Sequence, residues 1–242
     1  MGKVYDDGTI TLYQGDAWQV LQTLPDNTVD GIITDTPYSS GAVTIAGKQA
    51  PPSVKYQNTG TVKQYPEMLG DGKDQRGFLA CAVMWLSEAW RVARNGAQVL
   101  VFTDWRQLPT VTDALQAAGF FWRGIVIWNK RCGRPVLGEF RRDCEFIVYG
   151  SKGRYKPFTR RCLPCIYSHA ANPAKRLHIS GKPLPLLIDL MEIVAPGGTV
   201  LDPFAGGGTT AQAAKETGRK CITIELSAEY AEIATNSFIK SA

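Results

Sequence analysis

The sequence predicts an α/β fold built on a mostly parallel sheet. Apolar runs of strand length alternate with amphipathic helical segments along the chain, which is the pattern of successive strand–helix–strand units. Five of the expected strands end in an acidic residue, and in open α/β sheets the ligand site lies beyond the carboxyl ends of the strands. These acids are Asp16, Asp35, Asp104, Asp202 and Glu225. Taken singly, each acid is explained as well by a role as a helix N-cap as by a role in ligand binding.

The expected elements follow from hydrophobic periodicity and from turn residues. We expect strands at 9–13, 29–34, 98–103, 122–128, 145–149, 199–201 and 221–224, and helices at 17–24, 78–94, 108–118, 184–194 and 209–217. Asn95-Gly96 is expected to end the second of these helices. A single domain covers 1–242. It contains a mobile loop at 39–76 and a short basic segment at 150–181.

The composition is that of an ordinary globular protein, with 44% hydrophobic and 20% charged residues. The net charge of +5 permits a nucleic-acid partner without establishing one. No apolar run reaches membrane-spanning length, and the first residues have no signal-peptide core. The six irregularly spaced cysteines predict free thiols in a reducing compartment. We therefore expect a cytoplasmic protein, as a monomer or a homodimer.

The stretch 198–225 predicts half of a nucleoside-binding site, because it combines strand, glycine turn, helix and strand. Gly206, Gly208 and Ala211 occupy the places of the loose G-x-G-x-x-A dinucleotide fingerprint. Glu225 ends the second strand, where an acid can accept hydrogen bonds from a ribose diol. The fingerprint alone also fits a dinucleotide-dependent oxidoreductase. Only one helix follows Glu225 in the chain, so we expect the remaining strands of the sheet earlier in the sequence.

Three motifs together give the chain its family resemblance. Residues 202–210, DPFAGGGTT, are similar to the SAM-binding motif D-P-F-x-G-S-G-T-T. Residues 35–38, DTPY, are similar to the catalytic tetrapeptide D-P-P-Y, and residues 178–183, HISGKP, to the segment H-P-T-Q-K-P that precedes the SAM motif. In this order they resemble SAM-dependent DNA amino-methyltransferases of the circularly permuted β group. The departures are Thr36 in place of proline and Gly207 in place of serine.

The resemblance implies a Rossmann-like methyltransferase fold, circularly permuted, with helices on both faces of a mostly parallel seven-stranded sheet. The carboxyl-terminal unit would supply the first two strands of that sheet, and the amino-terminal half would supply the others. The strand that ends at Asp35 would then lie beside the strand that ends at Asp202.

The resemblance also implies the chemistry. Exocyclic amines of bases are poor nucleophiles, so Asp35 and the Thr36 carbonyl would each accept an amine N–H and direct the nitrogen lone pair at the methyl group of SAM. Tyr38 would stack on a flipped-out base. The implied catalytic residues are Asp35, Thr36, Pro37 and Tyr38. The implied residues of the SAM site are Asp16, Asp35, His178, Lys182, Asp202, Phe204, Ala205, Gly206, Gly208, Thr209 and Glu225.

Double-stranded DNA is the expected partner, and it would be contacted by the two segments that lack acidic residues. Their cations can pair with phosphates, and their aromatic residues can stack on bases. The expected DNA contacts are Lys48, Lys55, Lys152, Arg154, Lys156, Arg160, Arg161, Lys175 and Arg176. Because both segments are short, we expect short or relaxed sequence specificity.

Several alternatives remain open at this point. Adenine N6 is preferred as the target because D-P-P-Y more often accompanies it in the family, with cytosine N4 next. An RNA base or a protein glutamine offers a similar amine, and a DNA-binding protein without activity is a further reading. Cys162, Cys165, His169 and His178 could be taken for a zinc site, but their spacing fits no common zinc finger, so we expect no metal.

Overall fold

The computed structural model describes residues 2–39, 72–131, 137–155, 157–170 and 181–240. Most of the loop expected at 39–76 lies outside these ranges. The expected site residues Lys48, Lys55, Lys156, Lys175, Arg176 and His178 also lie outside them.

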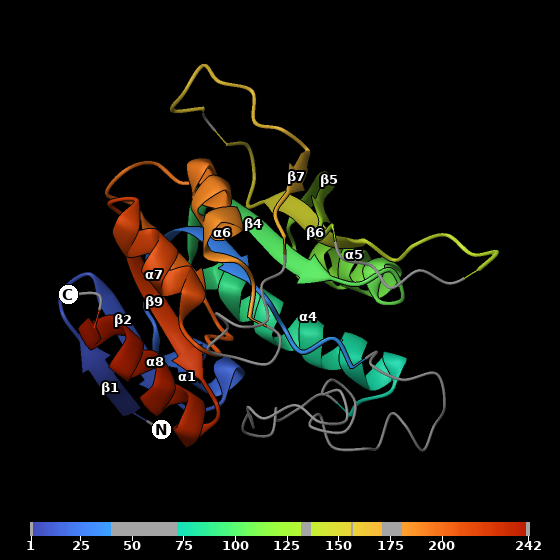
Figure 1. Cartoon of the computed structure of the whole chain (residues 1–242). Helices are drawn as coiled ribbons and strands as arrows, with labels where there is room; N and C mark the ends of the chain where they lie inside the picture. The colour runs from blue at the N-terminus through green and yellow to red at the C-terminus, as the bar shows by residue number, and fades with distance from the viewer. Residues whose placement is uncertain (1, 40–71, 132–136, 156, 171–180, 241–242) are drawn as a thin grey trace.

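Within the described residues, nine strands form one sheet in the order β1-β2-β9-β8-β3-β4-β6-β5-β7 (Figure 1). The strands are β1 (Gly2–Asp6), β2 (Ile10–Gln14), β3 (Val29–Thr34), β4 (Ala93–Thr103), β5 (Phe121–Asn129), β6 (Cys144–Ser151), β7 (Ile166–Ser168), β8 (Thr199–Asp202) and β9 (Lys220–Glu225). The run β2-β9-β8-β3-β4 is parallel throughout. Strand β6 runs antiparallel to both of its neighbours, β4 and β5.

The expected number of seven strands needs a correction, because two short strands extend the edges. Strand β1 forms an antiparallel pair with β2 at one edge, and the three-residue β7 pairs in parallel with β5 at the other. Neither strand has the long apolar run that predicts a buried strand: β1 is mostly exposed, and β7 is only three residues long. The seven strands between them form the expected mostly parallel sheet.

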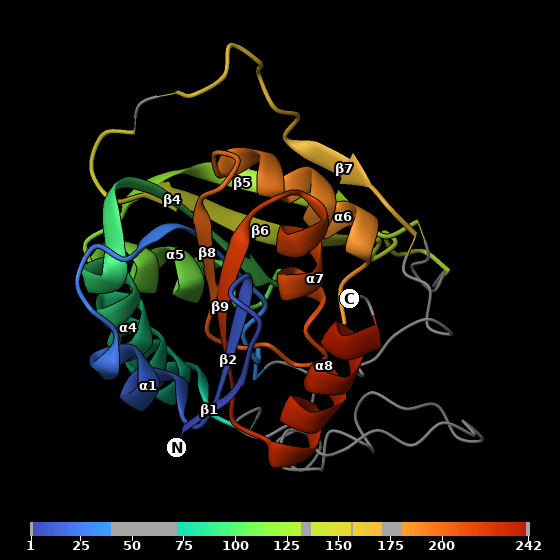
Figure 2. The ribbon, with the colours of Figure 1, turned by 90° about the vertical axis from the view of Figure 1, so that its left-hand side faces the viewer.

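Helices cover both faces of the sheet (Figure 2). One face carries α1 (Ala17–Thr23), α4 (Gln75–Val92) and α5 (Leu108–Ala117), and the other carries α6 (Leu184–Leu190), α7 (Thr209–Glu216) and α8 (Ala228–Lys240). A 3₁₀ turn, Met191–Ile193, continues α6. Among the described residues, no helix is both long and apolar enough to cross a bilayer.

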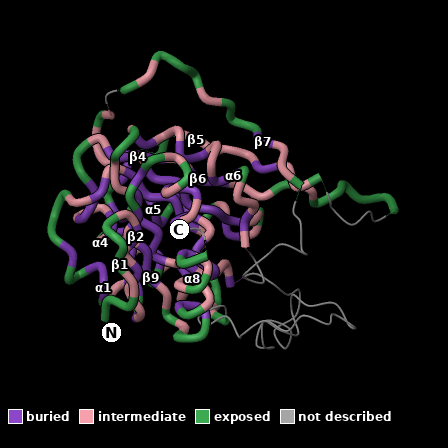
Figure 3. Tube along the Cα trace, turned by 60° about the vertical axis from the view of Figure 1, so that its left-hand side comes forward, coloured by how far each residue is buried: buried purple, intermediate pink, exposed green. Residues whose placement is uncertain are grey.

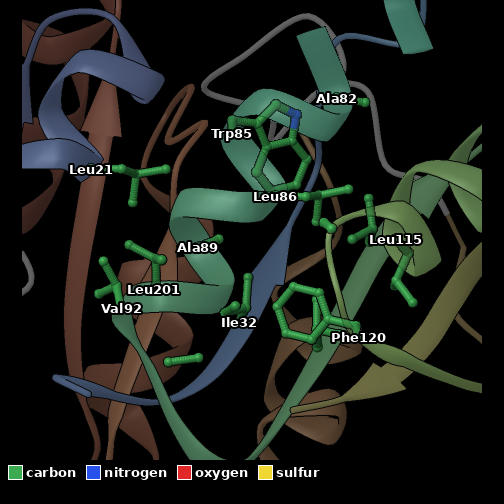
Figure 4. Close-up of a cluster of buried hydrophobic side chains, with 14 of the residues drawn as sticks. Leu21, Ile32, Ala82, Trp85, Leu86, Ala89, Val92, Leu115, Phe120 and Leu201 are labelled. Carbon is green, nitrogen blue, oxygen red and sulfur yellow. The ribbon is translucent and has the colours of Figure 1, made fainter. Parts of the chain in front are cut away.

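Two apolar clusters fill the layers between the helices and the sheet, and the central strands are buried on both faces (Figure 3). On the α4 side, Trp85, Leu86 and Val92 pack against Ile32 and Leu201 from neighbouring strands (Figure 4). Burying a side chain of this size contributes about 1.5–3 kcal/mol. This packing holds together β3 from the amino-terminal half of the chain and β8 from its carboxyl-terminal part.

Helix α4 begins and ends earlier than periodicity predicts. Its N-cap is Asp74, whose carboxylate accepts a hydrogen bond from the Gly77 amide at 2.7 Å. The expectation that Asn95-Gly96 ends the helix is wrong, because Ala93 is already extended and pairs with Val29 of β3. Sheet pairing over this stretch outweighs the local helical preference.

The turn before α7 requires glycine at position 208. Gly208 has a φ of +82°, and a Cβ atom there would lie 2.5 Å from Cε1 of Phe238 in α8. Gly218, just after α7, has a similar φ of +69° but open space around it. The two positions therefore separate backbone strain from steric crowding.

We predict that Gly218→Ala destabilises the protein by about 1 kcal/mol through left-handed backbone strain alone. Gly208→Ala adds overpacking against Phe238, which costs about 1–3 kcal/mol more. Urea unfolding of the two variants beside the parent measures both effects. Equal losses for the two variants would contradict the packing argument.

Candidate active site

A cavity of about 720 Å³ opens at the carboxyl ends of the parallel strands. Its walls come from both ends of the chain, because β3 and β8 are neighbours here and the strand order reverses between them. This reversal is the switch point at which α/β sheets bind their ligands. The described site residues that line the cavity are Asp16, Asp35, Thr36, Pro37, Tyr38, Lys182, Asp202, Phe204, Ala205, Gly206, Thr209 and Glu225.

One side of the cavity is formed by the ends of β8 and β9. Asp202 is buried and accepts hydrogen bonds from the Thr34 hydroxyl at 2.7 Å and from the Phe204 amide at 3.1 Å. Burial raises the pKa of Asp202 to about 6. Glu225 accepts from the amides of Gly206 and Ser227, each at 2.8 Å, and burial raises its pKa to about 7.

The glycine turn lies between these two acids. The Gly206 amide donates to Glu225, and the Ala205 amide donates to the Ile224 carbonyl at 2.8 Å, so the turn is fastened to the end of β9. Gly208, which sequence reasoning placed among the SAM contacts, does not line the cavity but caps α7 and packs under Phe238. Its role is therefore to shape the turn.

Asp16 is both a helix cap and a cavity residue. Its Oδ1 accepts a hydrogen bond from the Gln19 amide at 3.1 Å and caps α1, as the simpler reading of a strand-end acid expects. The residue is also exposed and lines the cavity. One carboxylate oxygen thus caps the helix, and the residue remains accessible to a ligand.

The opposite side of the cavity is formed by the segment after β3. Thr36 is buried, and Asp35, Pro37 and Tyr38 are partly buried against the cavity. The Tyr38 hydroxyl donates to Glu145 Oε2 at 3.2 Å. Burial, followed by the charges of Asp35 and Glu145, raises the pKa of Tyr38 well above its ordinary value, so the phenol stays protonated.

Lys182 is paired with two carboxylates on the side of the cavity that contains the segment after β3. Its ammonium lies 2.7 Å from Asp35 Oδ2 and 3.3 Å from Glu145 Oε2, and its side chain is 5% exposed. Sequence reasoning grouped Lys182 with the SAM contacts, whereas its observed partners are these two carboxylates. Burial would lower the pKa of Lys182, but Asp35 and Glu145 raise it above the ordinary value, so the ammonium keeps its charge.

Asp35 differs from an ordinary ion-paired carboxylate. Burial raises its pKa, the Lys182 charge lowers it, and the Glu145 charge raises it again, with a net shift upward. The group is thus a stronger base than a solvated aspartate. Strand β3, which precedes Asp35, also contacts the opposite side of the cavity, because the Thr34 hydroxyl donates a hydrogen bond to Asp202 of β8.

Sequence reasoning missed Glu145 and Lys130 as site residues. Both line the cavity, and the Lys130 ammonium lies 3.3 Å from Glu145 Oε1. The only available signal was an acid at the start of the expected strand 145–149, and an antiparallel strand begins at the edge where its parallel neighbours end.

The described basic residues of the segment 150–181 do not join the cavity. Strand β6 leads away from it, and Lys152 and Arg154 lie beside Gly96 at the other end of β4. The Lys152 ammonium donates to the Ala93 carbonyl at 2.7 Å and sits over the Trp90 ring, and Arg161 pairs with Glu192. Arg154, Arg160 and Arg161 are exposed, and a role of theirs in DNA binding stays a prediction.

The cysteine–histidine cluster is not assembled among the described residues. No group of three or more potential metal ligands lies together in that part of the chain. Cys162 and Cys165 are exposed free thiols, and His169 Nε2 lies 2.7 Å from Asp189 Oδ2.

Comparison with known proteins places the chain in a family. The model of the DNA methylase family N6_N4_Mtase matches residues 29–236. The chain belongs to this DNA methylase family. Protein YubD of Escherichia coli (strain K12), which is named as a methylase, is 31% identical over 221 residues, covering 90% of this chain and 85% of YubD.

Solved structures related to the DNA methylase family share the fold. A DNA modification methylase of Thermus thermophilus, TTHA0409, was solved in complex with S-adenosyl-L-methionine; it has a TM-score of 0.68 at 23% identity, over 95% of this chain and 94% of that one. The PvuII DNA methyltransferase, described as cytosine-N4-specific, has a TM-score of 0.74 at 15% identity, over 98% and 89%. These structures confirm the predicted fold, and the family model together with YubD confirms the predicted family resemblance.

The raised pKa of Glu225 predicts a pH-dependent cost of folding. The folded protein keeps the Glu225 proton up to about pH 7, whereas the unfolded chain releases it near pH 4.3. The contribution of Glu225 to the free energy of unfolding therefore falls as pH rises through this window, by about 1.4 kcal/mol per pKa unit.

Glu225→Gln removes this titration, so the stability of the parent relative to the variant should fall between pH 4.5 and pH 7. Urea unfolding at half-unit pH steps measures the difference. Glu232→Gln, an exposed position in α8, is the control for the loss of a carboxyl group at the surface. A flat difference for Glu225→Gln would contradict the buried carboxyl.

Proposed function

We propose that this DNA methylase transfers the methyl group of SAM to the exocyclic amino group of a DNA base, with adenine N6 as the preferred target. One observation carries the proposal. The Asp35 carboxylate and the glycine turn of residues 206–208 lie at neighbouring strand ends, and both segments line one cavity. SAM bound at the glycine turn and a base amino group bound at Asp35 would therefore lie next to each other.

The donor side fits a nucleoside carrying a positive charge. Glu225 would accept hydrogen bonds from the ribose hydroxyls, and the turn at Gly206 would let the protein backbone approach the ligand closely. Phe204 would add an apolar wall. The cavity volume lies in the usual range for sites that enclose small molecules, about 300–1,000 Å³. Asp202 and Glu225 also give this side a negative potential once they are ionised.

The side of the cavity that contains Asp35 supplies hydrogen-bond acceptors that would make an exocyclic amine more nucleophilic. The amine lone pair is delocalised into the base, and hydrogen bonds from its N–H groups to Asp35 and to the Thr36 carbonyl would localise that pair on nitrogen. Fixed acceptors of this kind act without reorganising during the reaction. Positioning then supplies much of the remaining acceleration.

The reaction balances with one proton released. SAM contributes a methyl group activated by its sulfonium, so that the N–C bond forms as the S–C bond breaks and a neutral thioether remains. The methylated nitrogen then carries a positive charge and must lose a proton. Asp35 would accept this proton, and the upward shift of its pKa by burial supports that role.

Adenine is preferred on the form of the catalytic tetrapeptide, since residues 35–38 begin with aspartate as in D-P-P-Y. Cytosine N4 is the second candidate, because the PvuII enzyme with the same fold is described as specific for it. Digestion of methylated DNA to nucleosides, followed by mass spectrometry, separates N6-methyladenine from N4-methylcytosine.

Duplex DNA is proposed to approach the mouth of the cavity. Lys73, Arg106 and Arg142 line the cavity, and Arg142 is exposed; such cations suit phosphates. The described part of the β5–β6 connection, residues 137–143, projects from the body (Figure 1), and its Arg142 lines the cavity. On this connection, Leu137 and Phe140 are 101% and 98% exposed. Apolar side chains of this kind can enter a base stack when a base is flipped.

Asp35→Asn is expected to lower kcat by about 100-fold or more, because the amine loses its anionic acceptor. Tritiated methyl transfer from SAM to unmethylated genomic DNA measures the rate. RNA and a protein mixture are assayed in parallel, as substrates of the competing readings. Asp30→Asn, at the other end of β3, is the matched control.

SAM should raise the melting temperature of the parent and of Asp30→Asn alike, and NAD should raise neither. Methylation of protein or RNA without methylation of DNA, or a melting shift with NAD instead of SAM, would overturn the proposal.

Arg142→Ala is expected to weaken DNA binding by several-fold and to make the salt dependence shallower, because one phosphate contact is lost. Arg154→Ala, at the far end of the sheet, serves as the comparison. Fluorescence anisotropy with a labelled duplex at several salt concentrations measures both variants. A larger effect of Arg154→Ala would place DNA on the segment 150–181 instead of the cavity mouth.

A further inference from the structure

We propose that Glu145 is a positioning residue for the methyl transfer, and that it acts by holding Lys182 and Tyr38 around Asp35. The inference rests on the proposed function, since it concerns the same cavity. Glu145 would not touch the target base. It would determine how the Asp35 carboxylate is presented to that base.

The first support is the number of site groups that one carboxylate contacts. Glu145 Oε2 lies 3.3 Å from the Lys182 ammonium and accepts from the Tyr38 hydroxyl at 3.2 Å, while Oε1 lies 3.3 Å from the Lys130 ammonium. The Glu145 side chain is 17% exposed. Both of its oxygens are therefore committed to groups at the wall of the cavity.

The second support is the order of the charges. The four groups alternate in sign along the chain of contacts Asp35–Lys182–Glu145–Lys130. Lys182 is thus shared between two carboxylates and cannot settle wholly on Asp35. A lysine paired with Asp35 alone would occupy it more fully and make it a weaker acceptor and a weaker base.

The third support concerns Tyr38. Its hydroxyl is held by Glu145, and its ring lies 5.1 Å from the Lys182 ammonium. The stacking surface expected for the flipped base is thereby fixed by the same carboxylate. Thr36 replaces the proline that would stiffen this loop, so contacts from outside the loop become the means of fixing it.

The competing explanation is a purely structural ion cluster. Removing one partner of a buried pair is destabilising whether or not the pair serves a reaction. A loss of stability alone therefore cannot support the inference. The pH profile can, because the Glu145 charge raises the pKa of Asp35, and a merely structural role would leave the acidic limb of the profile where it is.

The sign of the expected shift follows from the groups around Asp35. The Lys182 ammonium favours its ionised form, whereas the charges of Glu145 and Asp202 oppose it. Lys130 pairs with Glu145, and the Tyr38 hydroxyl donates to Glu145. Asp104, Arg106 and Arg142 line the same cavity and are present in every variant. Neutralising Glu145 removes one opposing charge, so Asp35 should ionise at lower pH.

The test compares Glu145→Gln, Glu145→Asp and the control Glu192→Gln, which removes an acid paired with Arg161 outside the cavity. For Glu145→Gln we expect kcat to fall by about tenfold or more and the acidic limb of the rate profile to move to lower pH. The Kd for SAM, measured by calorimetry, should change little. Glu145→Asp keeps the charge but not the reach, so the limb should stay while kcat falls.

An unchanged kcat in Glu145→Gln, or a fall in kcat that follows the melting temperature without any movement of the acidic limb, overturns the inference. A large loss of SAM affinity also overturns it, because Glu145 would then serve the donor. If Glu145→Gln does not fold, an unaltered kcat in Glu145→Asp has the same meaning. Failure of the parent protein to methylate DNA is a different result and refutes the proposed function itself.

Discussion

The pairing of β3 with β8 is the constraint on which the site depends. It joins segments from the two ends of the chain, and the buried hydrogen bond from Thr34 to Asp202 spans 168 positions of sequence. Parallel neighbours bring their carboxyl ends to the same edge of a sheet. The segment after β3 and the glycine turn after β8 are therefore brought together by the sheet, whatever their order along the chain.

The two sides of the cavity treat negative charge differently. Asp202 and Glu225 accept hydrogen bonds from neutral amides and from the Thr34 hydroxyl, and their pKa values rise to about 6 and about 7. Asp35 and Glu145 instead share the Lys182 ammonium. In the proposed reaction, Asp202 and Glu225 would bind the cationic SAM. Asp35 and Glu145, which are already paired with an ammonium, would suit a neutral base.

Local pattern was sufficient for the parts of the site that lie on consecutive elements. The glycine turn, Asp202 and Glu225 belong to one strand–helix–strand unit, so their spacing alone predicts a shared site. Asp35 was placed beside them through the family resemblance, and the β3–β8 pairing confirms that placement. The short edge strands β1 and β7 were missed because pairing, and not an apolar run, creates them.

Strand β6 accounts for what sequence reasoning could not place. It lies between β4 and β5 and runs antiparallel to both. This pairing cannot be predicted from the local hydrophobic periodicity of the sequence. Because of that direction, Glu145 near the start of β6 lies in the cavity. Lys152 and Arg154, which follow β6, lie at the opposite end of the strands. The basic composition of segment 150–181 therefore drew attention to residues whose described basic members do not line the cavity, whereas Glu145, which no motif indicated, does line it.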